Sequence, residues 1–232
     1  MTTDKIARFV AERRGQTPFL VVDLEEVERN YSTFRRALPD ARIFYAVKAN
    51  PAPEILALLA ELGACFDTAS VREIELVLAA GAGPERISYG NTIKKEADIA
   101  RAHALGVRLF AFDSDAELDK LARAAPGASV FCRILTSGEG ADWPLSRKFG
   151  CAPAMAERLL LRARVLGLDA MGISFHVGSQ QANPEAWNEA LASAALLFRR
   201  LSDQGVTLRL VNLGGGFPAR YLKAVPTAEA YG

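Results

Sequence analysis

The side chains of this sequence that could take part in chemistry follow one another at the carboxyl ends of predicted strands. Each strand is a short run rich in β-branched and aromatic residues, and a polar residue or a glycine ends it. The residues at these ends are Lys48, Asp67, Asn91, Asp113, Arg133, His176, Ser179, Gly214, Gly215 and Gly216. They combine an amine nucleophile, carboxylates, a guanidinium, an imidazole and a glycine-rich turn, and so predict a single site.

Lys48 is the candidate nucleophile. It follows the apolar run Ile43–Val47, and Asn50-Pro51 ends the strand because a residue before proline avoids helical backbone angles. A lysine amine in such a place can attack a carbonyl carbon. The alternative is a lysine whose aliphatic stem is covered while its charge stays in water. Lys48 taken alone favours this alternative, whereas the residues at the other strand ends favour the nucleophile.

The triplet Gly214, Gly215 and Gly216 ends the last predicted strand. One glycine would suffice for a tight turn with positive φ, whereas three in succession let backbone N–H groups approach a phosphate closely. Ser179 could donate a hydrogen bond to the same phosphate, or it could belong only to a loop. An amine nucleophile beside a phosphate-binding turn suits pyridoxal 5'-phosphate, held by Lys48 as a Schiff base.

Three further side chains have both a functional and a structural interpretation. His176 leaves its strand at the same rim, where its ring could stack on a planar cofactor, although a histidine is more often a satisfied core residue. Arg133 lies within an apolar strand, where an unpaired guanidinium is strongly disfavoured, so we expect an anionic partner, either Asp67 or the cofactor. Glu73 follows Ser70 at the spacing of a capping box, which favours a structural role.

The elements that would position these residues alternate regularly between strand and helix. Predicted strands begin near residues 43, 64, 87, 108 and 129, and an amphipathic helix lies between each and the next. Two more strands follow at 171–175 and 208–213, after a long loop over 136–150. Such alternation predicts a parallel sheet with right-handed crossovers. We count seven of the eight units of an α/β (β/α)8 TIM barrel, whose active site lies at the carboxyl ends of its strands.

Length and composition suit one α/β domain. The chain has 232 residues, of which 50% are hydrophobic, and its formal net charge is +1. Without a basic cluster, neither a nucleic-acid partner nor a membrane partner is expected. The three cysteines lack metal-ligand spacing and the chain has two histidines, so no metal site is expected. Since no apolar signal segment follows Met1, we expect a cytoplasmic protein with reduced thiols.

Four motifs in this order resemble the ornithine/diaminopimelate/arginine decarboxylase family of fold-type III pyridoxal-phosphate enzymes, whose barrel is alanine-racemase-like. The motifs are Tyr45-Ala46-Val47-Lys48-Ala49-Asn50, Phe66-Asp67-x-Ala69-Ser70, Ser174-Phe175-His176-Val177-Gly178-Ser179 and Gly214-Gly215-Gly216-Phe217-Pro218. The resemblance extends over residues 17–232. Within the family, Leu145-Ser146-Arg147-Lys148-Phe149-Gly150 is more similar to the ornithine decarboxylase branch than to the diaminopimelate branch.

The resemblance implies a role for each site residue. Lys48 would hold the cofactor covalently and His176 would stack on its ring, so that these two are the catalytic residues. Asp67 and Arg133 would belong to the network behind the ring. The remaining cofactor-binding residues would hold the phosphate, and they are Ser179, Gly214, Gly215 and Gly216.

The resemblance also implies a domain organisation. Members of the family continue with an eighth barrel strand that bears Glu-Pro-Gly-Arg, and then with a β-rich domain. We therefore expect residues 24–232 to be an incomplete pyridoxal-phosphate-binding barrel. Residues 1–23 would carry a leading strand, at 17–22, that joins the C-terminal β-domain. The 232-residue chain alone is expected to be inactive, and the full-length protein is expected to be a homodimer.

The predicted activity is pyridoxal-phosphate-dependent decarboxylation of a small basic amino acid, namely L-ornithine to putrescine in polyamine biosynthesis. Decarboxylation of diaminopimelate or lysine is one alternative. A non-catalytic pyridoxal-phosphate-binding barrel for cofactor homeostasis is a second, and the motifs around His176 and Gly214 stand against it. An inactive decarboxylase-like regulator that binds protein partners is a third, and Lys48 argues against that one.

Overall fold

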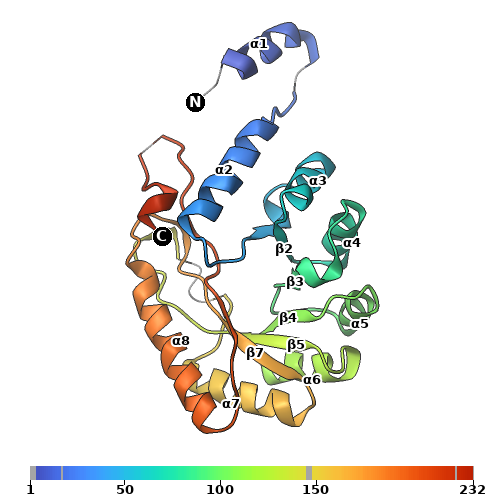
Figure 1. Cartoon of the computed structure of the whole chain (residues 1–232), viewed down its shortest axis with the longest axis vertical. Helices are drawn as coiled ribbons and strands as arrows, with labels where there is room; N and C mark the ends of the chain where they lie inside the picture. The colour runs from blue at the N-terminus through green and yellow to red at the C-terminus, as the bar shows by residue number, and fades with distance from the viewer. Residues whose placement is uncertain (1–3, 17, 145–147, 223, 232) are drawn as a thin grey trace.

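Seven strands form the main sheet, and all of them run parallel. The computed structural model describes residues 4–16, 18–144, 148–222 and 224–231. The strands, in their order across the sheet, are β1 (Phe44–Ala46), β2 (Cys65–Thr68), β3 (Ile87–Tyr89), β4 (Leu109–Phe112), β5 (Ser129–Arg133), β7 (Asp169–Ser174) and β9 (Leu210–Asn212). The sheet curls, with helices along its outer side (Figure 1). The prediction of a TIM barrel with seven of its eight strands is confirmed.

A helix lies in every crossover, and polar caps fix where several helices begin. The helices are α2 (Leu24–Ala37), which precedes β1, then α3 (Pro53–Glu61), α4 (Val71–Ala79), α5 (Glu96–Ala104), α6 (Asp115–Ala124), α7 (Pro153–Val165) and α8 (Ala186–Asp203). Ser70 Oγ accepts a hydrogen bond from the Glu73 N–H at 3.3 Å. Glu73 Oε2 accepts one from the Ala69 N–H at 2.6 Å, as the predicted structural role of Glu73 requires.

The core lies between the sheet and this layer of helices. Phe66 of β2, Phe110 of β4 and Val130 of β5 are each 0% exposed. Burying one such side chain contributes about 1.5–3 kcal/mol to stability. The strands of a parallel sheet are usually covered on both faces, and apolar residues accordingly predominate in β1 and β4. A rigid sheet of this kind holds the strand ends, and the polar residues on them, in fixed positions.

One predicted strand is absent. Residues 18–23 form no strand, and Thr17 lies outside the described residues. The apolar side chains of this segment favour extended backbone, but a strand also needs a neighbour to hydrogen-bond with, and no described strand pairs with it. The preceding residues form helix α1 (Asp4–Glu12) and the turn η1 (Arg14–Gln16), neither of which was predicted. The assignment of residues 1–23 to a separate domain stays a prediction.

A second, two-stranded sheet joins two loops at the carboxyl ends of the main strands. β6 (Ala141–Trp143) lies in the loop after β5, and β8 (Ser179–Gln181) lies in the loop after β7. They pair antiparallel, with Trp143 opposite Ser179. Gly178 has a φ of 97°, and a Cβ on it would lie 2.4 Å from Ala141 Cβ. This small sheet therefore fixes the backbone that leads from β7 to Ser179.

No helix among the described residues is long and apolar enough to cross a membrane.

Candidate active site

The rim at the carboxyl ends of the strands holds four of the predicted side chains. Lys48 lies on the 3-10 turn η2 (Val47–Ala49) directly after β1, and its side chain is exposed. Asp67 lies in β2, Arg133 ends β5, and His176 follows β7. The positive charges of Lys48 and Arg133 both act on Asp67 and on His176. The fold thus brings these four residues, which are far apart in the sequence, within electrostatic reach of one another.

Asp67 is held over a glycine that follows the neighbouring strand β3. A Cβ on Gly90 would lie 1.9 Å from Asp67 Oδ1, so only glycine leaves room for the carboxyl group. Burial raises the pKa of Asp67 to about 6, while the charge of Lys48 acts in the opposite direction. Asp67 can therefore hold or release a proton near neutral pH.

His176 is neutral at neutral pH and is fixed in one orientation. Burial lowers the pKa of its imidazole to about 4, and the charges of Arg133 and Lys48 act in the same direction. The Gly178 N–H donates to His176 Nδ1 at 3.0 Å, so the proton of the neutral ring is on Nε2. The Thr136 hydroxyl donates to the backbone carbonyl of His176 at 2.6 Å. The ring is thus an uncharged flat surface at the rim.

Arg133 does not form the predicted ion pair with Asp67. Within the described ranges, no carboxylate pairs with its guanidinium, which lies over the Phe149 ring at 5.2 Å from the centroid. Asp113 is engaged elsewhere, because its Oδ2 accepts a hydrogen bond from the Gly150 N–H at 2.8 Å. Burial lowers the pKa of Arg133, while the charges of Asp113 and Asp67 oppose that shift. The cofactor remains the other predicted partner for this guanidinium.

The glycine triplet after β9, which we call the glycine turn, is irregular backbone packed closely against the loop that carries His176. Gly214 and Gly216 have φ values of 73° and 99°, in the left-handed region that favours glycine. A Cβ on Gly216 would lie 2.0 Å from the carbonyl oxygen of Gly178. Among the residues described, the N–H groups of Gly215 and Gly216 have no hydrogen-bond acceptor. Unpaired N–H groups on a closely packed glycine turn can bind a phosphate.

Ser179 lies beside the glycine turn, whereas the side chain of Asn91 bonds within its own loop. Ser179 begins β8, and the N–H of Gln181 in the same strand donates to the Gly216 carbonyl at 2.8 Å. Ser179 therefore lies on a strand that is tied directly to the glycine turn. The side-chain amide of Asn91 donates to the Ile93 carbonyl at 2.8 Å. Asn91 is thus engaged within its own loop.

Lys94 is a buried cation near the rim that sequence reasoning missed. Its Nζ donates to the carbonyl of Ala111 at 2.6 Å, and Glu117 Oε1 lies 2.9 Å from the same nitrogen. Burial lowers the pKa of Lys94 to about 8, and Glu117 opposes that shift. The only signals were a lysine soon after a strand and a glutamate in a capping box. Neither indicates that the two side chains meet, because they lie on consecutive β/α units.

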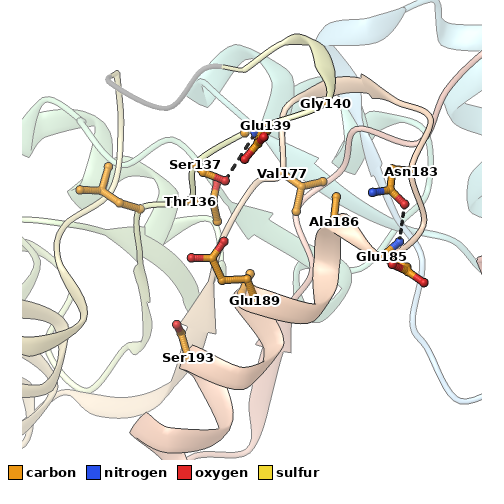
Figure 2. A pocket seen from close by; sticks show the side chains of 13 residues that line it. Thr136, Ser137, Glu139, Gly140, Val177, Asn183, Glu185, Ala186, Glu189 and Ser193 are labelled. Carbon is orange, nitrogen blue, oxygen red and sulfur yellow. Dashed lines mark hydrogen bonds between the residues drawn. The ribbon is translucent and has the colours of Figure 1, made fainter.

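A cavity of about 360 Å³ adjoins the rim on the side of α8. The loop 135–140 and the first half of α8 line it, with Val177 between them (Figure 2). The Glu139 N–H donates to Ser137 Oγ within the lining loop, and Glu189 faces the cavity from α8 (Figure 2). None of the predicted cofactor-binding residues lines this cavity. It therefore adjoins the site built by the strand ends, through Thr136 and Val177, without including the predicted residues.

Residues 24–231 match the family of pyridoxal-dependent decarboxylases, specifically their pyridoxal binding domain. This chain belongs to the pyridoxal-dependent decarboxylases. The predicted family, of fold type III, is thereby confirmed, and so is pyridoxal phosphate as its cofactor. The unpaired N–H groups of the glycine turn and the exposed Lys48 amine are the features of the site that fit this cofactor.

This pyridoxal-dependent decarboxylase chain spans about half the length of the curated relatives it matches. It is 46% identical over 206 residues to lysine/ornithine decarboxylase of Selenomonas ruminantium, which covers 89% of this chain and 52% of that protein. It is 42% identical over 209 residues to ornithine decarboxylase of Rattus norvegicus, covering 90% and 45%. It is 40% identical over 215 residues to antizyme inhibitor 2 of Xenopus laevis, covering 93% and 47%.

Solved structures of decarboxylases have the same fold. Lysine decarboxylase from Selenomonas ruminantium has a TM-score of 0.91 at 41% identity, covering 100% of this chain and 62% of that one. Arginine decarboxylase of the Paramecium bursaria Chlorella virus has a TM-score of 0.90 at 30% identity, covering 99% and 62%. SrLDC in complex with PLP and cadaverine has a TM-score of 0.90 at 41% identity, covering 100% and 60%. The family therefore comprises decarboxylases of basic amino acids.

The motif at residues 145–150 suggested the ornithine decarboxylase branch. Its first three residues, 145–147, lie outside the described ranges.

Proposed function

We propose that this chain is the cofactor-binding barrel of an enzyme that removes CO₂ from L-ornithine and releases putrescine, a step of polyamine biosynthesis. The observation that carries the proposal is the convergence of Lys48, Asp67, Arg133 and His176 on the rim that holds the glycine turn. The activity is proposed for the whole protein, because the chain spans about half the length of its relatives.

The cofactor-binding role of the rim is supported by the chemistry of each group. The exposed amine of Lys48 can bind the aldehyde of pyridoxal phosphate. The N–H groups of the glycine turn and the hydroxyl of Ser179 can bind its phosphate. When bound, the cofactor supplies a ring that accepts the electron pair left on the α-carbon as CO₂ departs.

The remaining residues would orient that ring and set the charge around it. The neutral imidazole of His176 offers a flat surface for stacking and adds no positive charge beside the ring. The N–H of Gly178 holds the orientation of this ring, and the hydroxyl of Thr136 holds the backbone carbonyl of His176. Arg133 contributes a positive charge and Asp67 a carboxyl group that titrates near neutral pH. Together these two would form the polar network behind the ring.

Ornithine is proposed as the substrate on the branch motif at 145–150, and lysine is the second candidate. The 46% identity to a lysine/ornithine decarboxylase favours lysine as much as it favours ornithine.

We also propose that the protein is a cytoplasmic homodimer. The three cysteines are free thiols, which suits a reducing compartment.

Borohydride reduction tests the role of Lys48. The protein is mixed with pyridoxal phosphate and reduced, and the labelled peptide is mapped. We expect the label on Lys48, and Lys48→Ala should remove both the label and the visible absorbance while leaving the melting temperature nearly unchanged. The matched control is Lys95→Ala, another exposed lysine, which should keep the label. A label on Lys94, Lys95 or Lys148 would show that Lys48 is not the anchor.

Release of CO₂ tests the activity and the substrate together. Ornithine, lysine, arginine and meso-diaminopimelate are offered in turn to the whole protein and to residues 1–232. We expect the whole protein to prefer ornithine and the 232-residue chain to show no turnover. The physical reason is that seven strands leave β1 and β9 as open edges, so the barrel that would surround the cofactor is not closed. Turnover by the 232-residue chain as a monomer would contradict this expectation.

A second candidate function is regulation without catalysis. The 40% identity to antizyme inhibitor 2 favours it. A whole protein that binds pyridoxal phosphate on Lys48 but releases no CO₂ from any of the four amino acids would support this alternative over the decarboxylase.

A further inference from the structure

We propose that Trp187 is a positioning residue for the phosphate-binding turn, and that its indole holds both ends of the glycine triplet in place. This inference rests on the proposed role of the triplet in binding phosphate. Trp187 is the second residue of α8 and is 6% exposed. Sequence reasoning did not single it out, because a tryptophan near the start of an amphipathic helix is an ordinary core residue.

The indole contacts the chain on each side of the triplet. Its Nε1–H donates a hydrogen bond to the carbonyl of Leu213, the residue directly before Gly214, at 3.3 Å. Its ring stacks on Phe217, the residue directly after Gly216, with centroids 4.9 Å apart and an interplanar angle of 22°. One side chain therefore restrains the backbone at the entry and at the exit of the turn.

The Gly214 N–H donates to Asn212 Oδ1 and the Gly216 carbonyl accepts from the Gln181 N–H, each at 2.8 Å, but the rest of the triplet needs further restraint. Glycine loses more conformational freedom on folding than any other residue, and here three occur in succession. In the described part of the chain, the N–H groups of Gly215 and Gly216 have no acceptor that would hold them. A phosphate binds tightly only if these groups are already directed at one point before it arrives, since the cost of ordering them would otherwise reduce the affinity.

Two more rings contact Phe217. Phe34 of α2 contacts Phe217 edge-on at 4.7 Å, and Tyr231, after the turn η4 (Ala228–Ala230), contacts it at 5.3 Å. The Tyr231 hydroxyl also donates to the Gln181 carbonyl at 2.8 Å. Of these rings, Trp187 is the one that is also hydrogen-bonded to the backbone ahead of the triplet. A single substitution of Trp187 would therefore remove a restraint at each end of the glycine turn.

The experiment compares pyridoxal 5'-phosphate with pyridoxal, which has the same aldehyde and ring but no phosphate. The dissociation constants of both are measured by absorbance titration, and their ratio gives the phosphate preference. The variants are Trp187→Leu, which removes the stacking and the hydrogen bond, and Trp187→Phe, which keeps a ring but removes the N–H. The control is Leu201→Ala, near the other end of α8, where the side chain is 0% exposed.

Trp187→Leu should lower the phosphate preference about tenfold or more, which corresponds to about 1.4 kcal/mol, while leaving the Kd for pyridoxal unchanged. Trp187→Phe should lower the preference by less, about two- to tenfold, the usual net value of one hydrogen bond. Leu201→Ala should lower the melting temperature and leave the preference as in wild type. That contrast separates positioning of the turn from a general loss of stability.

An unchanged preference in Trp187→Leu would overturn the inference. Should that variant not fold, Trp187→Phe decides, and an unchanged preference there overturns it as well. A wild-type protein that binds pyridoxal and pyridoxal phosphate equally would instead refute the phosphate-binding role of the glycine turn. A wild-type protein that binds neither compound would refute the proposed function itself.

Discussion

The Asp67 carboxyl group lies so close to the backbone of Gly90 that a Cβ at residue 90 would be 1.9 Å from Oδ1. The two residues belong to neighbouring β/α units, and β2 and β3 pair directly. The backbone directly after β3 thus lies against the carboxyl group carried by β2, the preceding strand. The chemistry of Asp67 therefore depends on the register of the sheet as well as on the residue type.

Gly90→Ala should displace the Asp67 carboxyl group. The φ of Gly90 is not in the left-handed region, so the effect of an added methyl group is steric. We expect a loss of about 1–3 kcal/mol in the free energy of unfolding, as for other overpacked sites, together with weaker binding of pyridoxal phosphate. Urea unfolding and absorbance titration measure the two effects. Gly15→Ala is the control, because no atom lies within 4 Å of the added Cβ; equal effects of the two substitutions would show that Asp67 is not held by this contact.

Asp67→Asn should change how stability depends on pH. Burial raises the pKa of Asp67 from 3.8 to about 6, so the folded state keeps a proton that the unfolded state releases between these values. The contribution of Asp67 to stability therefore falls as pH rises through this window. Relative to wild type, Asp67→Asn should gain roughly 2 to 3 kcal/mol between pH 4 and pH 7. Chemical unfolding of the cofactor-free protein at several pH values measures this, and a stability difference that stays constant with pH would contradict it.

His176→Gln should have the opposite dependence. Burial lowers the pKa of His176 from 6.5 to about 4, so the unfolded state binds a proton that the folded state excludes between these values. The wild type therefore loses stability from this group as pH falls through the window, and the variant should lose roughly 3 kcal/mol less. His103→Gln, at a less buried imidazole on α5, should change the profile less. In the wild type the contributions of Asp67 and His176 oppose each other, so the single variants are needed to detect either.

Glu117→Gln should be strongly destabilising. Glu117 Oε1 lies 2.9 Å from Lys94 Nζ, and these side chains are 3% and 0% exposed. Removing the carboxylate leaves a buried ammonium without its partner, at a cost of about 3–5 kcal/mol in the free energy of unfolding.

The control for Glu117→Gln is the exposed ion pair between Arg101 and Glu75, whose side chains are 57% and 48% exposed. Glu75→Gln should cost less than about 1 kcal/mol. The double variant Lys94→Met/Glu117→Gln should recover part of the loss, because it no longer buries an uncompensated ammonium. Equal costs for the buried and the exposed pair would refute the assignment of Lys94 as a buried cation.

Much of the fold could be predicted from the sequence, because local interactions decide it. Ser70 and Ser114 each cap a helix through the N–H of a residue three positions later, a contact that needs nothing outside that segment. Apolar runs of strand length, separated by amphipathic helices, dictate a parallel sheet whose carboxyl ends share one rim. The presence of Lys48, Asp67, His176 and the glycine triplet at that rim follows from chain order alone.

The rest was decided by the tertiary structure, because it depends on residues far away in the chain. The Thr136 hydroxyl bonds to the carbonyl of a residue 40 positions later, and the Trp187 indole to one 26 positions later. Residues 18–22 have the composition of a strand but form none, since strand formation requires a partner that no local pattern specifies. The pKa of Asp67 is likewise set by burial under neighbouring segments. Local propensity specifies what a segment can form, whereas burial and pairing become defined only when the whole chain is packed.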